Sequence, residues 1–192
     1  MDRHVLHIYL THIIDSAEDS QRALARLDSA IAQHAVGSVF SELDRFLVQA
    51  SRVSRFLWPG APGGCTNAER NQRRSQSNVR ANTLRGALEI GDDHGLRDRS
   101  LRDHLEHTDE RLDDWANSST RHSFADRNIG PANSIVGLDP ADMFRHYDPK
   151  SGVFSYRGEN FDIPIIARAM MDVLDKAKVA LAAQESSASG PF

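Results

Sequence analysis

Cysteine, lysine and aromatic residues are all scarce in this chain, and each scarcity narrows what the protein can be. Cys65 is the only cysteine among 192 residues, so no intrachain disulfide or four-cysteine metal site can form. A reducing, cytoplasmic setting is therefore expected. Aromatic residues make up 7% of the chain, which fits helices packed through aliphatic side chains better than a β-sandwich. Lysine occurs only three times, so arginine supplies nearly all the positive charge.

Long apolar runs and the common catalytic motifs are also missing. No apolar stretch approaches the roughly 18 residues that a membrane span needs, so we expect a soluble protein without a membrane partner. His4, His7 and His12 interrupt the first apolar segment, which argues against a secretion signal. There is no phosphate-binding glycine loop, no Gly-x-Ser-x-Gly elbow and no His-Glu-x-x-His pair, and we predict no cofactor.

Apolar residues recur at steps of three and four along most of the chain, which predicts amphipathic helices. The predicted helices run from Arg3 to about His34, from beyond Gly37 to Trp58, from Thr66 or Asn67 to about Ile90, from Ser100 to about Ala116, and onward from about Asp162. Residues 59–64 are rich in proline and glycine and predict a loop, and 91–95 predict a polar turn. Helices joined by such short connections are typical of an antiparallel bundle.

The chain changes character after Asn117. Ser134–Val136 predicts a short strand, and residues 143–147 and 153–157 predict a β-hairpin around DPKSG. The sequence therefore predicts one mainly α domain over residues 1–183, an antiparallel four- to five-helix bundle with a small β-hairpin insertion near residues 132–158. A flexible tail is expected over residues 184–192.

The predicted fourth helix separates an apolar stripe from a flank of basic and imidazole side chains. At about 100° per residue, its predicted buried stripe consists of Leu101, Leu105, Thr108, Leu112 and Trp115. The flank beside this stripe consists of Arg97, His104, His107 and Arg111. This flank is either a functional surface or an ordinary solvated boundary of the helix.

The preceding helix is rich in arginine. No acidic residue occurs between Arg70 and Arg85, and asparagine and glutamine fill much of the space between the arginines. Because the net charge of -4 gives no general attraction to nucleic acid, binding would need a local patch of this kind. Guanidinium groups suit bidentate contacts with phosphate. The candidate nucleic-acid-binding residues are Arg70, Arg73, Arg74 and Arg80.

The segment Arg102-Asp103-His104-Leu105-Glu106-His107 resembles the Arg-polar-x-x-x-His signature of the HEPN superfamily of nucleotide-binding helical bundles. The same pattern can be written from Arg99 to His104. The resemblance implies RNA binding or metal-independent RNA cleavage. It also implies that Arg102 holds the phosphate, that Asp103 fills the polar position and that His107 acts on the 2′-hydroxyl or the leaving oxygen.

Two features of the motif bear on how it would work. Asp109 stands where some family members carry tyrosine. Residues five apart lie about 140° from each other around a straight helix, so Arg102 and His107 do not share a face. The family resolves this by dimerisation, and the hypothesis therefore requires a homodimer. Arg97, His104 and Arg111, which lie on one flank together with His107, form a rival set.

Two other classes of function remain open. One is a bundle metalloprotein in which His104 and His107 ligate a metal together with Asp114 or a residue from another helix, although no Glu-x-x-His pair accompanies them. Alternatively, the protein is a non-catalytic helical interaction or structural protein whose function lies in its surfaces.

Overall fold

The computed structural model describes residues 1–60, 66–98 and 100–188, apart from the side chains of Leu101, Arg102, Glu106, Ser187 and Ala188. Within these ranges the protein is mainly helical, with a small four-stranded sheet. The helices are α1 (Arg3–Ala32), α2 (Val36–Leu57), α3 (Asn67–Ala87), α4 (Ser100–Glu106), α5 (Thr108–Ser118) and α6 (Ile163–Ala188). Most of the predicted 59–64 loop, together with Cys65 and Arg99, lies outside the described residues.

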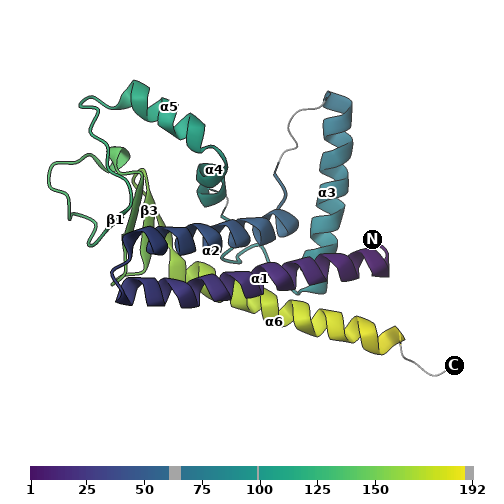
Figure 1. Cartoon of the computed structure of the whole chain (residues 1–192). Helices are drawn as coiled ribbons and strands as arrows, with labels where there is room; N and C mark the ends of the chain where they lie inside the picture. The colour runs from purple at the N-terminus through teal and green to yellow at the C-terminus, as the bar shows by residue number, and fades with distance from the viewer. Residues whose placement is uncertain (61–65, 99, 189–192) are drawn as a thin grey trace.

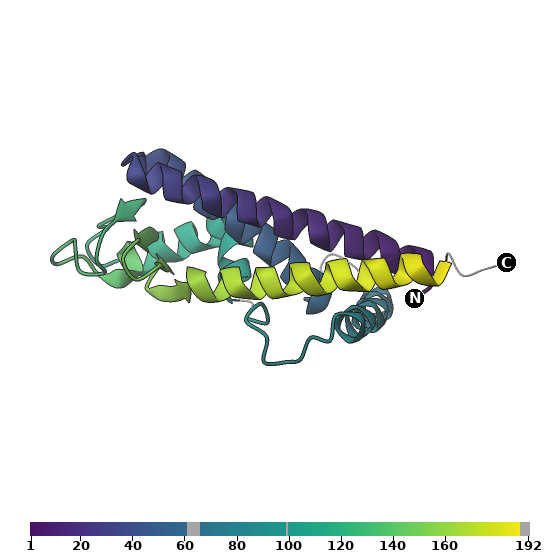
Figure 2. The ribbon, with the colours of Figure 1, turned by 90° about the horizontal axis from the view of Figure 1, so that it is seen from below.

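Helices α1, α2 and α6 form the body of the molecule. α1 and α2 are antiparallel neighbours, and α6 runs back along α1 (Figures 1 and 2). Their shared core contains Leu10, Ile13, Leu27, Phe40, Leu43, Phe46, Leu47, Met170 and Val173, each almost completely buried. Burial of one such side chain contributes roughly 1.5–3 kcal/mol. The predicted stripes of these three helices are thereby confirmed.

The turn between α1 and α2 lies earlier than predicted. His34 adopts a left-handed conformation with φ of 54°, and the N–H of Ala35 donates to the carbonyl of Ala30. This local closure of α1 lets α2 begin at Val36. Gly37, the predicted break, lies in the first turn of α2.

Helix α3 stands away from the body and does not run along it (Figure 1). Thr66 caps its start and forms a capping box with Glu69, as the sequence predicts for one of two candidate caps. Leu84 and Leu88 are buried, whereas Val79 is exposed. The arginine-rich N-terminal half has too few apolar residues to pack against the body.

The predicted fourth helix is two helices. α4 ends at Glu106, and His107, with φ of −119° and ψ of 41°, separates it from α5. The break turns α5 away from the line of α4, so the predicted stripe does not stay buried: Thr108 and Leu112 are exposed, and Leu105 and Trp115 are half-buried. The side chain of Leu101 lies outside the described residues.

Four strands form one sheet in the order β1 (Asn128–Ile129), β2 (Arg145–Asp148), β3 (Val153–Tyr156) and β4 (Glu159–Asp162). β1 is parallel to β2, and the other pairs are antiparallel. The predicted hairpin is confirmed as β2 and β3, but the sheet is larger than a hairpin. Phe144, Tyr147, Phe154, Tyr156 and Phe161 join the core, so one face of the sheet packs against the helices.

The strand predicted at Ser134–Val136 is wrong. These residues lie in a looped segment, η1 (Pro140–Asp142) follows them, and the side chain of Val136 is 96% exposed. With no buried neighbour on either side, the apolar pair Ile135 and Val136 has no sheet to join.

α6 begins at Ile163 as predicted and continues to Ala188, so most of the predicted tail is helical here. No helix among the described residues has the length and apolar character to cross a bilayer. The mainly helical class is confirmed, with α1, α2 and α6 packed lengthwise and α3, α4 and α5 outside that group (Figure 2).

Candidate functional site

A cavity of about 330 Å³ lies where α4 and α5 meet the turn between β3 and β4. It is lined by Ser100, Asp103, His104, Arg111, Arg157 and Glu159. Three of the predicted site residues, Asp103, His104 and Arg111, therefore come together in one place. Arg157 and Glu159 come from the sheet, far along the sequence, and were not foreseen.

Both ring nitrogens of His104 have partners in this cavity. The residue is 6% exposed, and its ring stacks on Tyr156 with centroids 4.9 Å apart. The Nε of Arg111 donates to Nδ1 across 3.2 Å, and Nε2 lies 3.0 Å from the carboxylate of Glu159. Since Nδ1 accepts, the ring proton is on Nε2, which faces the carboxylate of Glu159. These contacts fix the orientation of the His104 ring, and the contact through Nδ1 positions Arg111.

Two guanidinium groups lie beside this histidine. Arg157 donates from Nη1 to the carbonyl of Arg111 across 2.7 Å, and its guanidinium lies over the ring of Phe144, 5.6 Å from the centroid. Arg111 also pairs with Asp114 at 3.4 Å. The carboxylates of Asp103 and Glu159 offset part of the positive charge of the two arginines. The cavity therefore suits a larger polar ligand that carries one anionic group better than it suits a small inorganic anion.

His107, the predicted catalytic histidine, lies outside this cavity at the start of α5. Its Nδ1 is 3.2 Å from the carboxylate of Glu110, and its side chain is 48% exposed. No hydrogen bond engages its Nε2 among the described residues. A carboxylate holding one ring nitrogen while the other faces solvent is the arrangement of a general acid or base.

The other two residues of the predicted sets do not join the cavity. The Nη1 of Arg97 donates to the carbonyl of Asp92 across 2.8 Å, and the side chain is exposed. The side chain of Arg102 lies outside the described residues, so its distance from His107 is not defined. The flank predicted from a straight helix is therefore divided. The side chains of His104 and Arg111 remain in contact, whereas those of Arg97 and His107 have other partners, the carbonyl of Asp92 and the carboxylate of Glu110.

The arginines of α3 fall into two groups. Near the end of the helix, Arg80 donates to the carbonyl of Arg55 and lies over the ring of Tyr9, so it anchors α3 to the body. Toward the start, every residue from Asn67 to Gln76 is exposed, including Arg70, Arg73 and Arg74. Arg73 and Arg74 have no carboxylate within 4.0 Å in the described part of the chain.

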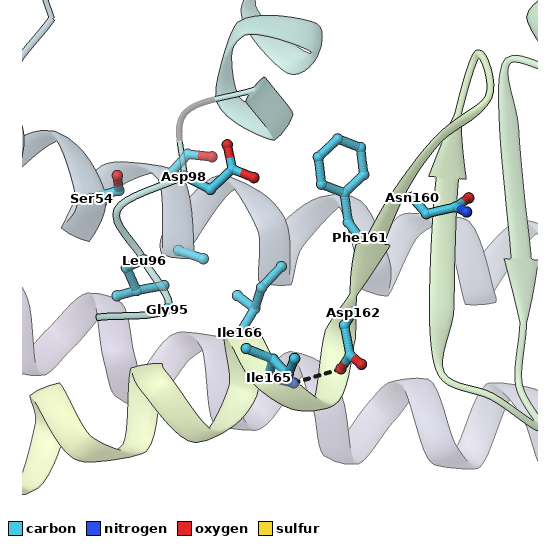
Figure 3. Close-up of a pocket in the computed structure, with 11 residues that line it drawn as sticks. Ser54, Gly95, Leu96, Asp98, Asn160, Phe161, Asp162, Ile165 and Ile166 are labelled. Carbon is cyan, nitrogen blue, oxygen red and sulfur yellow. Dashed lines mark hydrogen bonds between the residues drawn. The ribbon is translucent and has the colours of Figure 1, made fainter. Parts of the chain in front are cut away.

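A second cavity, of about 270 Å³, lies between α2, the 95–98 segment, β4 and the start of α6 (Figure 3). Leu96, Phe161 and Ile166 provide apolar walls, and Asp162 caps α6 by accepting from the N–H of Ile165 across 2.8 Å. The hydroxyl of Ser54 lines the cavity and is buried without a hydrogen-bond partner. Nothing in the helical periodicity of the sequence indicates this cavity, because its walls come from four separate segments.

Across residues 1–60, 66–98 and 100–188, no three histidine, cysteine or carboxylate side chains gather closely enough to hold a metal ion. His104 and His107 have separate carboxylate partners, Glu159 and Glu110.

Comparison of the chain with protein-family models, with curated proteins and with solved structures finds no match. The resemblance to the HEPN superfamily thus depends on the motif from Arg102 to His107, and function must be argued from the geometry described above.

Proposed function

We propose that the protein is a HEPN-like RNA-binding protein and that the N-terminal half of α3 is its main contact with the RNA backbone. The observation that carries this proposal is the projecting, fully exposed run from Asn67 to Gln76 with Arg73 and Arg74 lacking carboxylate partners. A cation without a protein partner is available to a phosphate, and arginine binds phosphate in a bidentate manner.

The shape of α3 supports the same reading. A helix that is polar on all sides gains little from packing against its own domain. α3 is nevertheless well formed: a capping box begins it, Arg80 and Arg85 tie its far end to α2, and Leu84 is buried. The chain therefore holds a rigid basic helix clear of the body (Figure 1). Such an element suits a long polyanion.

Salt dependence tests this proposal most simply. Fluorescence anisotropy of a labelled RNA should show binding by the wild type that weakens as salt rises. The double variant Arg73→Ala/Arg74→Ala should bind more weakly and should lower the slope of log K against log salt by about 1.4, which is the value for two phosphate contacts on a single strand.

The matched control is Arg22→Ala/Arg52→Ala, which removes the same formal charge from α1 and α2. Arg22 is paired with Asp19, and Arg52 donates to Gln49, so neither is available in the same way. The control should keep the wild-type slope. Absence of RNA binding by the wild type at low salt, or an equal loss in both double variants, contradicts the role of α3.

Metal-independent RNA cleavage is a second candidate function, and one observation favours it: the His107–Glu110 pair with its open Nε2. In this mechanism Nε2 removes the proton of a ribose 2′-hydroxyl, the 2′-oxygen attacks the adjacent phosphorus to form a 2′,3′-cyclic phosphate, and the bond from phosphorus to the 5′-oxygen breaks. The leaving 5′-oxygen takes a proton from water, and the imidazole later returns its proton to the solvent. Glu110 orients the imidazole and is a positioning residue. A guanidinium from Arg102 or Arg111 would stabilise the charge of the pentacoordinate state.

Cleavage is tested with labelled RNA in the presence of a chelator. His107→Ala should lower the rate by about 10²–10⁴ without weakening RNA binding, and Glu110→Gln should lower kcat with KM unchanged. The control is His12→Ala, which replaces an exposed histidine on α1 and should leave the cleavage rate unchanged. Wild-type protein that binds RNA but leaves it intact restricts the function to binding.

The HEPN hypothesis also requires a homodimer that brings two motifs to one cleft. Sedimentation equilibrium of the wild type should give twice the chain mass of 21.4 kDa. A monomer at concentrations where RNA is cleaved contradicts the shared cleft. A dimer that binds no RNA favours the alternative of a non-catalytic interaction protein.

A further inference from the structure

The face of the sheet that points away from the helices covers a small cavity of about 220 Å³. Its other wall is the looped segment after β1, which contributes Ile135, Leu138, Pro140 and Met143. Figure 1 places this end of the sheet at the opposite side of the molecule from α3. The cavity is therefore far from the basic helix, and it shares no lining residue with the His104 cavity.

Polar side chains form a row across the floor of this cavity. Asn128 on β1 is the register partner of His146 on β2, His146 is the partner of Ser155 on β3, and Ser155 is the partner of Asn160 on β4. Register partners point to the same face of a sheet with Cβ atoms about 4.5–5.5 Å apart. His146 and Ser155 are 3% and 8% exposed. An apolar wall thus faces a buried polar floor.

The hydrogen bonds of this row leave one donor without an acceptor. The amide nitrogen of Asn128 contacts both the hydroxyl of Ser134 and Nδ1 of His146, at 2.8 Å in each case. Since that nitrogen donates, Nδ1 accepts and the ring proton is on Nε2. Nε2 is buried and has no hydrogen-bond partner. A buried donor that makes no hydrogen bond destabilises the fold, so such a group indicates that an acceptor is missing.

The neighbouring pair supplies the complementary group. Ser155 donates its hydroxyl proton to Oδ1 of Asn160 across 2.7 Å, which leaves the lone pairs of the serine oxygen to accept. The floor thus presents an N–H donor from His146 beside a hydroxyl acceptor from Ser155. A cis-amide edge, with its C=O and N–H side by side, matches this pair.

We infer that this cavity binds a small, flat, uncharged ring that carries a lactam edge, of the kind found in 2-pyridone and uracil. The carbonyl of the ring accepts from Nε2 of His146, and the ring N–H donates to Ser155. The apolar wall of Ile135, Leu138 and Met143 covers the face of the ring. The volume is below the range of about 300–1,000 Å³ for drug-sized ligands, which suits a single ring.

Charge argues against an ionic ligand. Burial lowers the pKa of His146, and although Asp148 and the carbonyl of Gly130 oppose this, the net direction is downward, so burial disfavours the charged imidazole. Asp139 is the only charged side chain lining the cavity among the described residues, and its carboxylate accepts from the N–H of Ala141. An anionic ligand would therefore find no lysine or arginine among the described residues that line this cavity.

The test uses the full chain and 2-pyridone as the probe, followed by NMR. At millimolar concentration 2-pyridone should shift the imidazole Nε2 signal of His146 and the methyl signal of Met143, and benzene should leave the Nε2 signal unchanged. Ser155→Ala should weaken binding about three- to tenfold, corresponding to one hydrogen bond. His146→Phe should abolish the preference for 2-pyridone over benzene.

Two further variants separate this site from the rest of the molecule. Val136→Ala, at a solvent-exposed position of the same looped segment, should bind 2-pyridone like the wild type. Arg73→Ala/Arg74→Ala should also bind it normally, so failure of RNA binding leaves this inference standing. Repeating the titration with uridine and with a short oligouridylate shows whether the lactam belongs to a free nucleoside or to a base in a chain.

A shift of the His146 signal that Ser155→Ala weakens supports the lactam site. No shift with 2-pyridone or uracil, equal effects of benzene, or wild-type affinity in Ser155→Ala overturns it, and the cavity then holds only water.

Discussion

Arg145 connects the sheet to the helical body, and its removal gives the sharpest prediction about stability. Its Nε donates to one oxygen of Asp126 across 2.8 Å, Nη2 pairs with the other oxygen, and Nη1 lies 3.2 Å from Asp44 on α2. The Arg145 side chain is 22% exposed. Exposed ion pairs contribute about 0–1 kcal/mol, and breaking a buried pair costs about 3–5 kcal/mol. For this half-buried, bidentate case we expect Arg145→Ala to lower the free energy of unfolding by about 2–3 kcal/mol.

The pH dependence of that loss is also defined. Burial raises the pKa of Asp126, but the hydrogen bond and charge of Arg145 outweigh burial and lower it below its usual value. A lowered carboxyl pKa contributes stability above the unfolded-state pKa of about 3.9 and loses it as the pH falls through the folded-state pKa. The difference in the free energy of unfolding between wild type and Arg145→Ala should therefore be largest at pH 7 and should decrease below about pH 4.

Urea denaturation at several pH values measures both effects. The control is Arg45→Ala, whose side chain is 62% exposed and pairs with Glu42, and which should cost at most about 1 kcal/mol. A loss below about 0.5 kcal/mol in Arg145→Ala at pH 7, or a loss that is the same at pH 3 and pH 7, would refute the role of this network.

Two further predictions concern single positions. Gly152 has φ of +73°, and a Cβ there would lie 2.8 Å from the ring of Pro164, so Gly152→Ala should destabilise the protein by about 2 kcal/mol or more in urea, whereas Gly37→Ala, where a Cβ meets nothing, should not. Thr66→Ala removes the cap of α3 and should cost that helix about 1 kcal/mol, seen as faster amide exchange in residues 67–76 with little change in global unfolding. Unchanged exchange in Thr66→Ala would show that the capping box does not hold the projecting helix.

The helices of the body were predictable because their chemistry is local. α1 has no glycine or proline, and its apolar residues keep one stripe for its whole length, as do those of α6 after Pro164. The hairpin was also predictable, since the DPKSG turn lies between two apolar segments. These elements satisfy helix or strand periodicity without help from distant residues.

The elements that were missed depend on contacts across the chain. No proline or glycine precedes the break at His107. His104, near the end of α4, stacks on Tyr156 of β3 and contacts Glu159 of β4. These contacts orient α4 by the sheet and not by α5. β1 has two residues, too few for a periodic signal. β4 follows β3 after a two-residue turn, Arg157 and Gly158, which the sequence reading assigned to the end of the hairpin.

The candidate site was predictable in part for the same reason. Helical spacing placed His104 and Arg111 on one flank, and Asp103 was named only through the resemblance to the HEPN motif. Arg157 and Glu159 reach the cavity only because the sheet folds back onto α4 and α5, and no local pattern foretells this. The polar row through His146 was hidden for a similar reason, since its four members come from four strands.

The most direct test of the central claim is an NMR titration of the full chain with a short RNA, following the guanidinium Nε–H signals of arginine. The account predicts that the signals of Arg73 and Arg74 shift and saturate together, and that those of Arg22 and Arg52 stay in place. Shifts spread evenly over all arginines, or an RNA that leaves Arg73 and Arg74 unchanged, would contradict the assignment of α3 as the RNA-binding element.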